Sequence, residues 1–263
     1  MVHLRLIGAF ARASAQGELA YRTNFLISLL HTGLNLGTGI LALQVVFGQV
    51  DAVNGWDFPA TLALLGVYLT LSALRGLFIG PSLEALAGMD GEIWTGKFDF
   101  TLLRPVDVQF QATFRHWRPL ALTDLALGLA VLGIAAASMD HTLSALHVAS
   151  FLVTLGAGVM ILYAILLAFS ALVFWSPGFL FTWVFDGLYQ MARYPVQVYP
   201  GWLRIVLTWI VPVGTMTTVP AQALSGTSSW LGLLGGTTLA MVLFLGASAL
   251  FRYGLRRYAS ASS

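Results

Sequence analysis

The sequence contains no cysteine and little charge. Of its 263 residues, 58% are hydrophobic and only 9% are charged, whereas a soluble domain has roughly a quarter charged residues. A water-soluble surface cannot be built from this composition, so the long apolar stretches along the chain predict a membrane domain rather than a soluble enzyme. The absence of cysteine excludes disulfide bonds, thiolate-bound zinc, iron–sulfur clusters and a cysteine nucleophile.

Positive charge is also sparse. The formal net charge is +2, and the basic residues are not interleaved with aromatic residues as they are in a nucleic-acid-binding surface. We therefore expect no nucleic-acid partner. The five histidines are scattered and do not have the spacing of metal ligands, so no metal site is predicted.

Long apolar stretches predict an all-α integral membrane protein. A membrane-spanning helix needs about 20 mostly apolar residues. Residues 1–22 have apolar residues on one side at helical spacing, which predicts an interfacial amphipathic helix or, alternatively, a longer first span. The whole chain, 1–263, is expected to form one transmembrane domain. Its six candidate spans are residues 24–47, 58–79, 118–138, 146–174, 178–193 and 229–251.

With these spans, eleven of the thirteen Lys and Arg residues fall on one side of the membrane. Only Arg193 and Arg204 fall on the other side. Because basic residues concentrate on the cytoplasmic side, both termini are expected in the cytoplasm. The eleven residues are Arg5, Arg12, Arg22, Arg75, Lys97, Arg104, Arg115, Arg118, Arg252, Arg256 and Arg257.

Two connecting segments differ from ordinary loops. The expected cytoplasmic segment 81–115 is the most charged part of the chain, yet it also contains Trp94, Phe98 and Phe100. Such a segment either packs on the membrane domain or is covered by another protein. The expected external segment 194–228 is apolar but interrupted by four prolines. It predicts short re-entrant helices between the fifth and sixth spans, shielded from lipid by other parts of the protein.

The spacing from Gly91 to Lys97 matches a phosphate-binding P-loop. Residue 98 is Phe where the motif needs a Ser or Thr hydroxyl for magnesium, and the bulky Trp94 stands where the backbone must wrap the phosphate. No apolar strand precedes the match. We therefore expect neither ATP nor any other cofactor to bind to this chain.

Two aspartates lie inside predicted spans, where carboxylates are costly and commonly functional. Asp124 is expected near the cytoplasmic end of the third span, and Asp186 is expected nearer the middle of the fifth. They are candidates for structural hydrogen bonding, for a site that gates transport, or for an intramembrane aspartyl dyad. Their different expected depths argue against the dyad.

Two strings of residues resemble a known family. Residues 91–106 read GEIWTGKFDFTLLRPV, and residues 193–204 read RYPVQVYPGWLR, followed by IVPVG at 210–214 and VPA at 219–221. Both resemble segments of the ABC-2-type exporter permeases, in particular the bacterial branch with a separately encoded ATPase. The matched positions are Ile93, Gly96, Asp99, Leu103, Arg104 and Pro105 in the first string, and Arg193, Tyr194, Pro195, Pro212 and Pro220 in the second.

The resemblance implies a permease subunit of an exporter in the bacterial cell membrane, not itself an enzyme. It implies that the first string is a coupling helix docked on an ATPase, and that the second is an external re-entrant region involved in gating. The implied partners are two ATPase subunits, which bind the ATP and magnesium, and a second permease, identical or related. The alternatives are an intramembrane aspartyl enzyme using Asp124 and Asp186, and an ATP-independent secondary transporter.

Overall fold

The computed structural model describes residues 2–19, 22–88, 90–139, 143–176, 178 and 182–258. Within these residues the chain is helical and has no strand, only an isolated bridge between Val53 and Trp56. The expected all-α class is therefore confirmed. The elements in chain order are α1 (Val2–Leu19), α2 (Arg22–Phe47), α3 (Phe58–Leu74), the π-helix η1 (Arg75–Ile79), α4 (Gly80–Glu84), α5 (Asp99–Leu102), α6 (Val108–Phe114), α7 (Ala121–Ala137), α8 (Ala145–Leu172), α9 (Thr182–Met191), the 3₁₀ turn η2 (Val196–Val198), α10 (Gly201–Ile205), the π-helix η3 (Val206–Ile210), α11 (Val213–Leu224) and α12 (Trp230–Arg257).

Three of the long helices begin at a side-chain cap. Asp57, Ser144 and Ser229 each accept a hydrogen bond from the backbone N–H three residues later, at the starts of α3, α8 and α12. A capping side chain satisfies a backbone donor that the first helical turn leaves unpaired. These caps set where the apolar helices start.

Three helical stretches in the described part of the chain are long and apolar enough to cross a membrane. They are Phe58–Glu84, Ala145–Leu172 and Trp230–Arg257. A further pair of helical stretches, Gly201–Ile210 and Val213–Leu224, is bent by 88°. If this pair is one broken span, the number of candidate spans is four. The expected first and third spans contain shorter apolar helices, and the expected fifth span, 178–193, contains the ten-residue α9. Residues 179–181 of that span lie outside the described residues.

The core forms where the long helices pack side by side. α8 packs along α12 and α11, and α3 packs along α7 and α11. Glycine permits the closest approaches: a Cβ on Gly128 of α7 would lie 2.8 Å from the backbone nitrogen of Thr70, and one on Gly158 of α8 would lie 2.6 Å from the carbonyl oxygen of Met216. Small residues at such contacts let helix backbones pack closely in a membrane.

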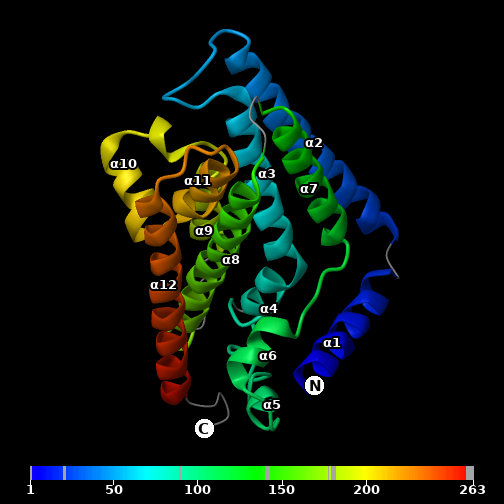
Figure 1. Ribbon diagram of the computed structural model, residues 1–263. Coiled ribbons are helices and arrows are strands. Elements are labelled where there is room, and N and C mark those ends of the chain that lie inside the picture. The colour runs from blue at the N-terminus through cyan, green and yellow to red at the C-terminus, as the bar shows by residue number, and fades with distance from the viewer. Residues whose placement is uncertain are drawn as a thin grey trace.

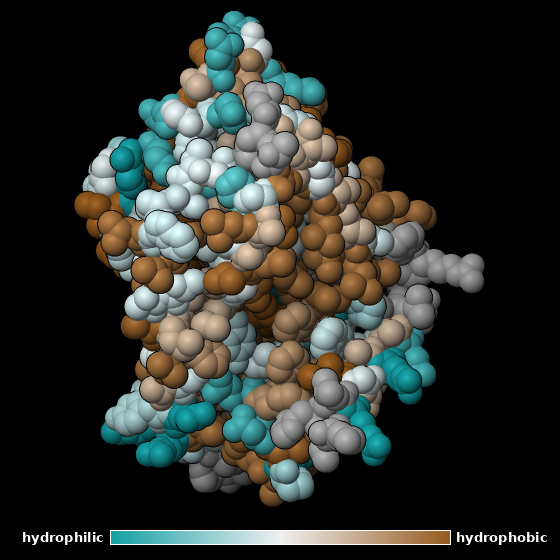
Figure 2. Space-filling model, in the orientation of Figure 1, coloured by the Kyte–Doolittle hydropathy of each residue, from teal (hydrophilic) through white to brown (hydrophobic). Residues whose placement is uncertain are grey.

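The first helix, α1, and the last turns of α12 lie at the same end of the bundle. Figure 1 shows α1, α5, α6 and the last turns of α12 together there, and we call this the α6 end. The opposite end carries the loop 48–57. Figure 2 shows hydrophobic residues across the middle of one face and hydrophilic residues gathered toward both ends. An apolar belt between two polar ends is the surface expected of a membrane protein.

Candidate functional site

The segment 91–106 at the α6 end is attached to the membrane domain by buried side chains. Phe98 is fully buried and contacts the rings of Phe174 and Tyr258. Ile93 is only 3% exposed and belongs to the same hydrophobic core. The structure therefore corrects the expectation that Ile93 contacts an ATPase, because its side chain is already packed against its own chain. Gly96 has a φ of +72°, a left-handed conformation that favours glycine.

Polar contacts hold the same segment near its start and at its middle. Asp99 accepts a hydrogen bond of 2.9 Å from the hydroxyl of Tyr258, just beyond α12. Burial and the carboxylate of Asp99 raise the pKa of Tyr258 to about 12. Arg115, just beyond α6, donates to Glu92 and Thr101, both at 2.9 Å. The segment is therefore tied to the ends of two helices.

Glu92 is held as a carboxylate at this junction. Its oxygens lie 2.9 Å from a guanidinium nitrogen of Arg115 and 3.3 Å from a ring nitrogen of His116. Burial opposes ionisation, but the hydrogen bond with His116 and the charge of Arg115 outweigh it, so the pKa of Glu92 lies below its usual value. An ionised Glu92 keeps the segment bound to the residues after α6.

The outer face of the segment is apolar and exposed. Leu103 is 80% exposed, Phe100 is 67% exposed and Trp94 is 53% exposed. Arg104 and Pro105 beside them are also exposed. Large apolar residues clustered at a polar end of a protein indicate a surface that another molecule covers. We call Trp94, Phe100, Leu103 and Arg104 the exposed apolar surface.

The P-loop-like spacing does not form a P-loop. Residues 92–98 form turns, and α5, which follows, has only four residues. A P-loop connects a strand to a long helix whose N-terminus faces the phosphate. The glycines at 91 and 96 instead serve the turns that bury Ile93 and Phe98.

A second candidate site is a polar cavity of about 290 Å³ between α2, α3, α7 and α9. Asp124 and Asp186 both line it, which corrects the expectation that their depths keep them in separate places. The reason is that α9 is short, so that Asp186 lies level with Arg75 at the end of α3. The hydroxyl of Thr32 donates to Asp124 over 2.6 Å.

Arg75 lines this cavity and contacts two carboxylates, whereas the sequence alone placed it only among the basic residues expected on the cytoplasmic side. Its guanidinium donates to Asp186 with one nitrogen and to Glu84 with another, the latter over 2.7 Å. The same group lies over the ring of Phe185, 4.8 Å from its centre. A lone arginine at the end of an apolar span was the signal in the sequence, because such a charge needs a partner.

The second string of family-like residues is divided between three places. Arg193 points into the bundle, donates to Asn35 of α2 over 2.9 Å and lies over the ring of Tyr68. Tyr194 is exposed and Pro195 is buried. Pro212 stands at the 88° bend before α11. Pro220 is buried inside α11, which packs between α3 and α8.

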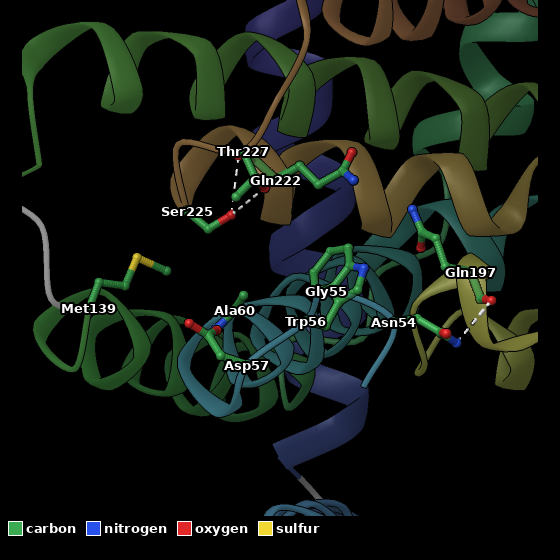
Figure 3. Close-up of a pocket in the computed structure, with 10 residues that line it drawn as sticks. All are labelled: Asn54, Gly55, Trp56, Asp57, Ala60, Met139, Gln197, Gln222, Ser225 and Thr227. Carbon is green, nitrogen blue, oxygen red and sulfur yellow. Dashed lines mark hydrogen bonds between the residues drawn. The ribbon is translucent and has the colours of Figure 1, made fainter. Parts of the chain in front are cut away.

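A pocket of about 350 Å³ lies at the opposite end of the bundle (Figure 3). It brings the loop before α3 together with η2 and the end of α11. The side-chain nitrogen of Asn54 donates to the carbonyl of Gln197 over 3.3 Å, and the hydroxyls of Ser225 and Thr227 lie 2.9 Å apart. The pocket shows that residues 194–228 pack against the loop 48–57.

Comparison with known protein families identifies the family of this helical bundle. The family described as ABC-2 family transporter protein matches residues 34–262, which is most of the chain and includes the segment 91–106 and, except for Thr32, the residues that line both cavities. The chain belongs to the ABC-2 transporter family. Comparison with curated proteins and with solved structures gave no significant match.

As an ABC-2 family member, the chain is a permease of an ABC transporter, which works with ATPase partners. The family forms the membrane component of transport and is not itself catalytic. This assignment favours transport over the aspartyl-enzyme interpretation. The geometry agrees, because Asp186 of this permease is paired with Arg75 and Asp124 with Thr32, so that each carboxylate has its own partner.

Proposed function

We propose that this permease is the membrane-spanning subunit of a bacterial ABC exporter and that separate ATPase subunits dock on its exposed apolar surface. The observation that carries the proposal is the contrast within the segment 91–106. Ile93 and Phe98 are buried in the permease, whereas Phe100 and Leu103 project into solvent. A segment with a fixed inner face and an apolar outer face is suited to receive force from a docked protein.

The attachments of the segment give a route for that force. Two ATPase subunits close when they bind ATP and magnesium, and their movement displaces the segment. The contact of Asp99 with Tyr258 transmits the displacement to α12, and the contacts of Glu92 with Arg115 and His116 transmit it to α6 and to the chain that leads into α7. Rigid helices carry such movements without deforming, because packed cores have discrete arrangements.

Contacts at the two ends support six crossings of the membrane. Gly178 lies beside Trp94 at the α6 end, and Gln197 bonds with Asn54 at the opposite end. The chain between them runs from one end to the other although α9 has only ten residues. Helices α2, α3, α7, α8 and α12 run lengthwise along the bundle between these two ends (Figure 1).

The distribution of charge supports the proposed orientation. The α6 end carries the basic residues of α1, of the segment 91–106 and of the end of α12, so we place it in the cytoplasm. The α1 helix then lies at the cytoplasmic interface, and residues 194–228 form an external re-entrant region that gates the path. A second permease, identical or related, completes the path.

The docking proposal is tested by comparing exposed and buried residues of one segment. In the double variant Phe100→Ala and Leu103→Ala, co-purification of the ATPase should fall by about tenfold or more, because truncating interface anchors costs roughly 1–3 kcal/mol each. The amount of folded permease should not change. The matched control Leu231→Ala truncates a leucine that is 85% exposed at the opposite end, and it should retain the ATPase.

The variant Ile93→Ala separates docking from folding. It removes a buried side chain and should lower the stability of the permease by about 2–5 kcal/mol, so the yield of folded protein falls first. Full ATPase binding and normal transport in the Phe100→Ala, Leu103→Ala variant would refute the proposed docking surface.

A further inference from the structure

A third cavity, of about 660 Å³, lies between α6, α8 and α12 at the α6 end. It is larger than the polar cavity around Arg75 and is formed by different residues. Phe78 and Ile79 of η1 form its back wall. This volume is within the range of pockets that bind small molecules, roughly 300–1,000 Å³.

The walls of this cavity favour an apolar occupant. Aromatic and aliphatic side chains such as Phe114, Met160 and Phe244 line it. Its polar side chains mostly bind one another: Gln109 donates to the hydroxyls of Tyr163 and Ser248 over 3.1 and 3.0 Å, and the hydroxyls of Thr113 and Tyr163 lie 2.8 Å apart. Paired polar groups require no polar ligand.

Two charged side chains line the cavity, the guanidinium of Arg252 and the carboxylate of Asp107. Arg252 lines the cavity, is exposed, and has no hydrogen-bond or ion-pair partner among the described residues. Asp107 also lines the cavity and brings a negative charge, but its carboxylate forms no ion pair with Arg252 among the described residues and instead accepts the N–H of Phe110 as the cap of α6. An unpaired guanidinium above an apolar cavity is complementary to an anionic phosphate attached to a hydrocarbon chain.

The length of the cavity matches one leaflet of a bilayer. On α12, Phe244 and Arg252 are eight residues apart, or about 12 Å along the axis. Tyr163 of α8 contacts Phe244, and Gly156, which lines the deep end, lies about 10 Å beyond Tyr163 along α8. The two distances, along α12 and along α8, add to a cavity length of about 22 Å. This is close to half the thickness of a bilayer, which is roughly 40–45 Å with its headgroups.

We propose that this cavity holds an acyl chain of one phospholipid from the leaflet at the α6 end, with the phosphate bound by Arg252. The proposal goes beyond the proposed transport function, since it requires neither ATPase nor transported substrate. The bound lipid contacts α6, α8 and α12 at once and fills the space between them. It therefore stabilises the position of α6, which follows the segment 91–106 in the chain.

Gly156 and Gly133 provide a matched pair of variants. Both are exposed helical glycines with nothing within 4 Å of an added Cβ, but only Gly156 lines the cavity. Gly156→Leu fills the deep end, and Gly133→Leu adds the same side chain on α7. Arg252→Gln removes the charge at the mouth, and Arg256→Gln removes an exposed charge one turn further along α12.

The experiment counts retained phospholipid. The proteins are reconstituted in vesicles of phosphatidylcholine and phosphatidylglycerol, extracted in mild detergent, delipidated by gel filtration and examined by native mass spectrometry. We expect one phospholipid per chain in the wild type, in Gly133→Leu and in Arg256→Gln. Retention should fall roughly tenfold in Gly156→Leu, because the inserted side chain displaces apolar contacts, and should also fall in Arg252→Gln.

Two results would overturn the proposal. The first is unchanged phospholipid retention in Gly156→Leu, or an equal loss in Gly133→Leu. The second is a retained molecule without a phosphate group, which would assign the cavity to another amphiphile. Neither result depends on ATPase co-purification, so failure here is distinct from failure of the proposed function.

Discussion

Arg75 joins two carboxylates that are 9 and 111 residues away in the sequence, Glu84 and Asp186. Its planar guanidinium can serve both, because its donors point in several directions. The three groups together carry one net negative charge, and among the described residues the carboxylate of Asp124 in the same cavity has only the neutral hydroxyl of Thr32 as a hydrogen-bond partner. The carboxylates around the cavity therefore outnumber its basic groups. Arg75 supplies the positive charge that offsets part of their negative charge.

This asymmetry predicts that Arg75→Gln is more damaging than Asp186→Asn. Losing the guanidinium leaves two carboxylates without a counter-charge and should cost about 1–3 kcal/mol, at the low end of the range for buried pairs because both carboxylates are partly exposed. Asp186→Asn leaves Arg75 paired with Glu84 and should cost less than about 1 kcal/mol. Thermal unfolding in detergent measures both.

The exposed Arg256→Gln is the control for Arg75 and should stay within about 0.5 kcal/mol of the wild type. Equal destabilisation by Arg75→Gln and Asp186→Asn would mean that Glu84 contributes nothing to the network.

The sequence could not distinguish the buried from the exposed apolar residues of the segment 91–106. Ile93 and Leu103 are similar side chains in a similarly mixed-charge setting, yet one is 3% exposed and the other 80%. Tight turns around Gly91 and Gly96, and the contact with Phe174 of the distant α8 end, decide which face is buried. The family-like string identified the segment, and only the tertiary structure identified its outer face.

At the scale of helices, α8 and α11 approach each other closely at Gly158. A Cβ there would lie 2.6 Å from the carbonyl oxygen of Met216, which is backbone and cannot move independently. Gly158→Ala should therefore separate the two helices and destabilise the permease by about 1–3 kcal/mol. The unfolding temperature of the detergent-solubilised protein measures this.

Gly156→Ala, two residues away on the same helix, is the control. Nothing lies within 4 Å of its added Cβ, and replacing a helical glycine by alanine is otherwise favourable by up to about 1 kcal/mol. If both variants unfold at the same temperature, the contact with Met216 does not limit the packing of α8 on α11.

Helix boundaries were predictable where an apolar run follows a capping residue. The expected spans 146–174 and 229–251 correspond to α8 and α12, which start after Ser144 and Ser229. The expected span 178–193 corresponds to the much shorter α9. Hydropathy alone cannot give the length of a helix that is packed among other helices, because tertiary contacts rather than lipid then cover its polar groups.

For the whole molecule, the two ends differ in what they carry. The α6 end has α1, the last turns of α12, the segment 91–106 and most of the basic residues, and the opposite end has the loop 48–57 and the pocket of Figure 3. Between the two ends, the packing of α2, α3, α7 and α9 pairs Arg75 with Asp186 and brings two aspartates to one cavity. The pairing and the shared cavity were not predictable from sequence spacing, because they join segments more than 60 residues apart.

The absence of native cysteine permits a direct test of which end faces the cytoplasm. Asp51 and Lys97 are exposed at opposite ends of the bundle and are separated by the helical stretch Phe58–Glu84. Because basic residues concentrate on the cytoplasmic side of a membrane, we expect Lys97 to face the cytoplasm and Asp51 to face the outside. A membrane-impermeant maleimide should then label Asp51→Cys in intact cells and Lys97→Cys only after permeabilisation. Gln49→Cys, two residues from Asp51, should repeat the Asp51→Cys result. The reverse pattern would invert the proposed orientation, and labelling of both positions from one side would show that Phe58–Glu84 does not cross the membrane.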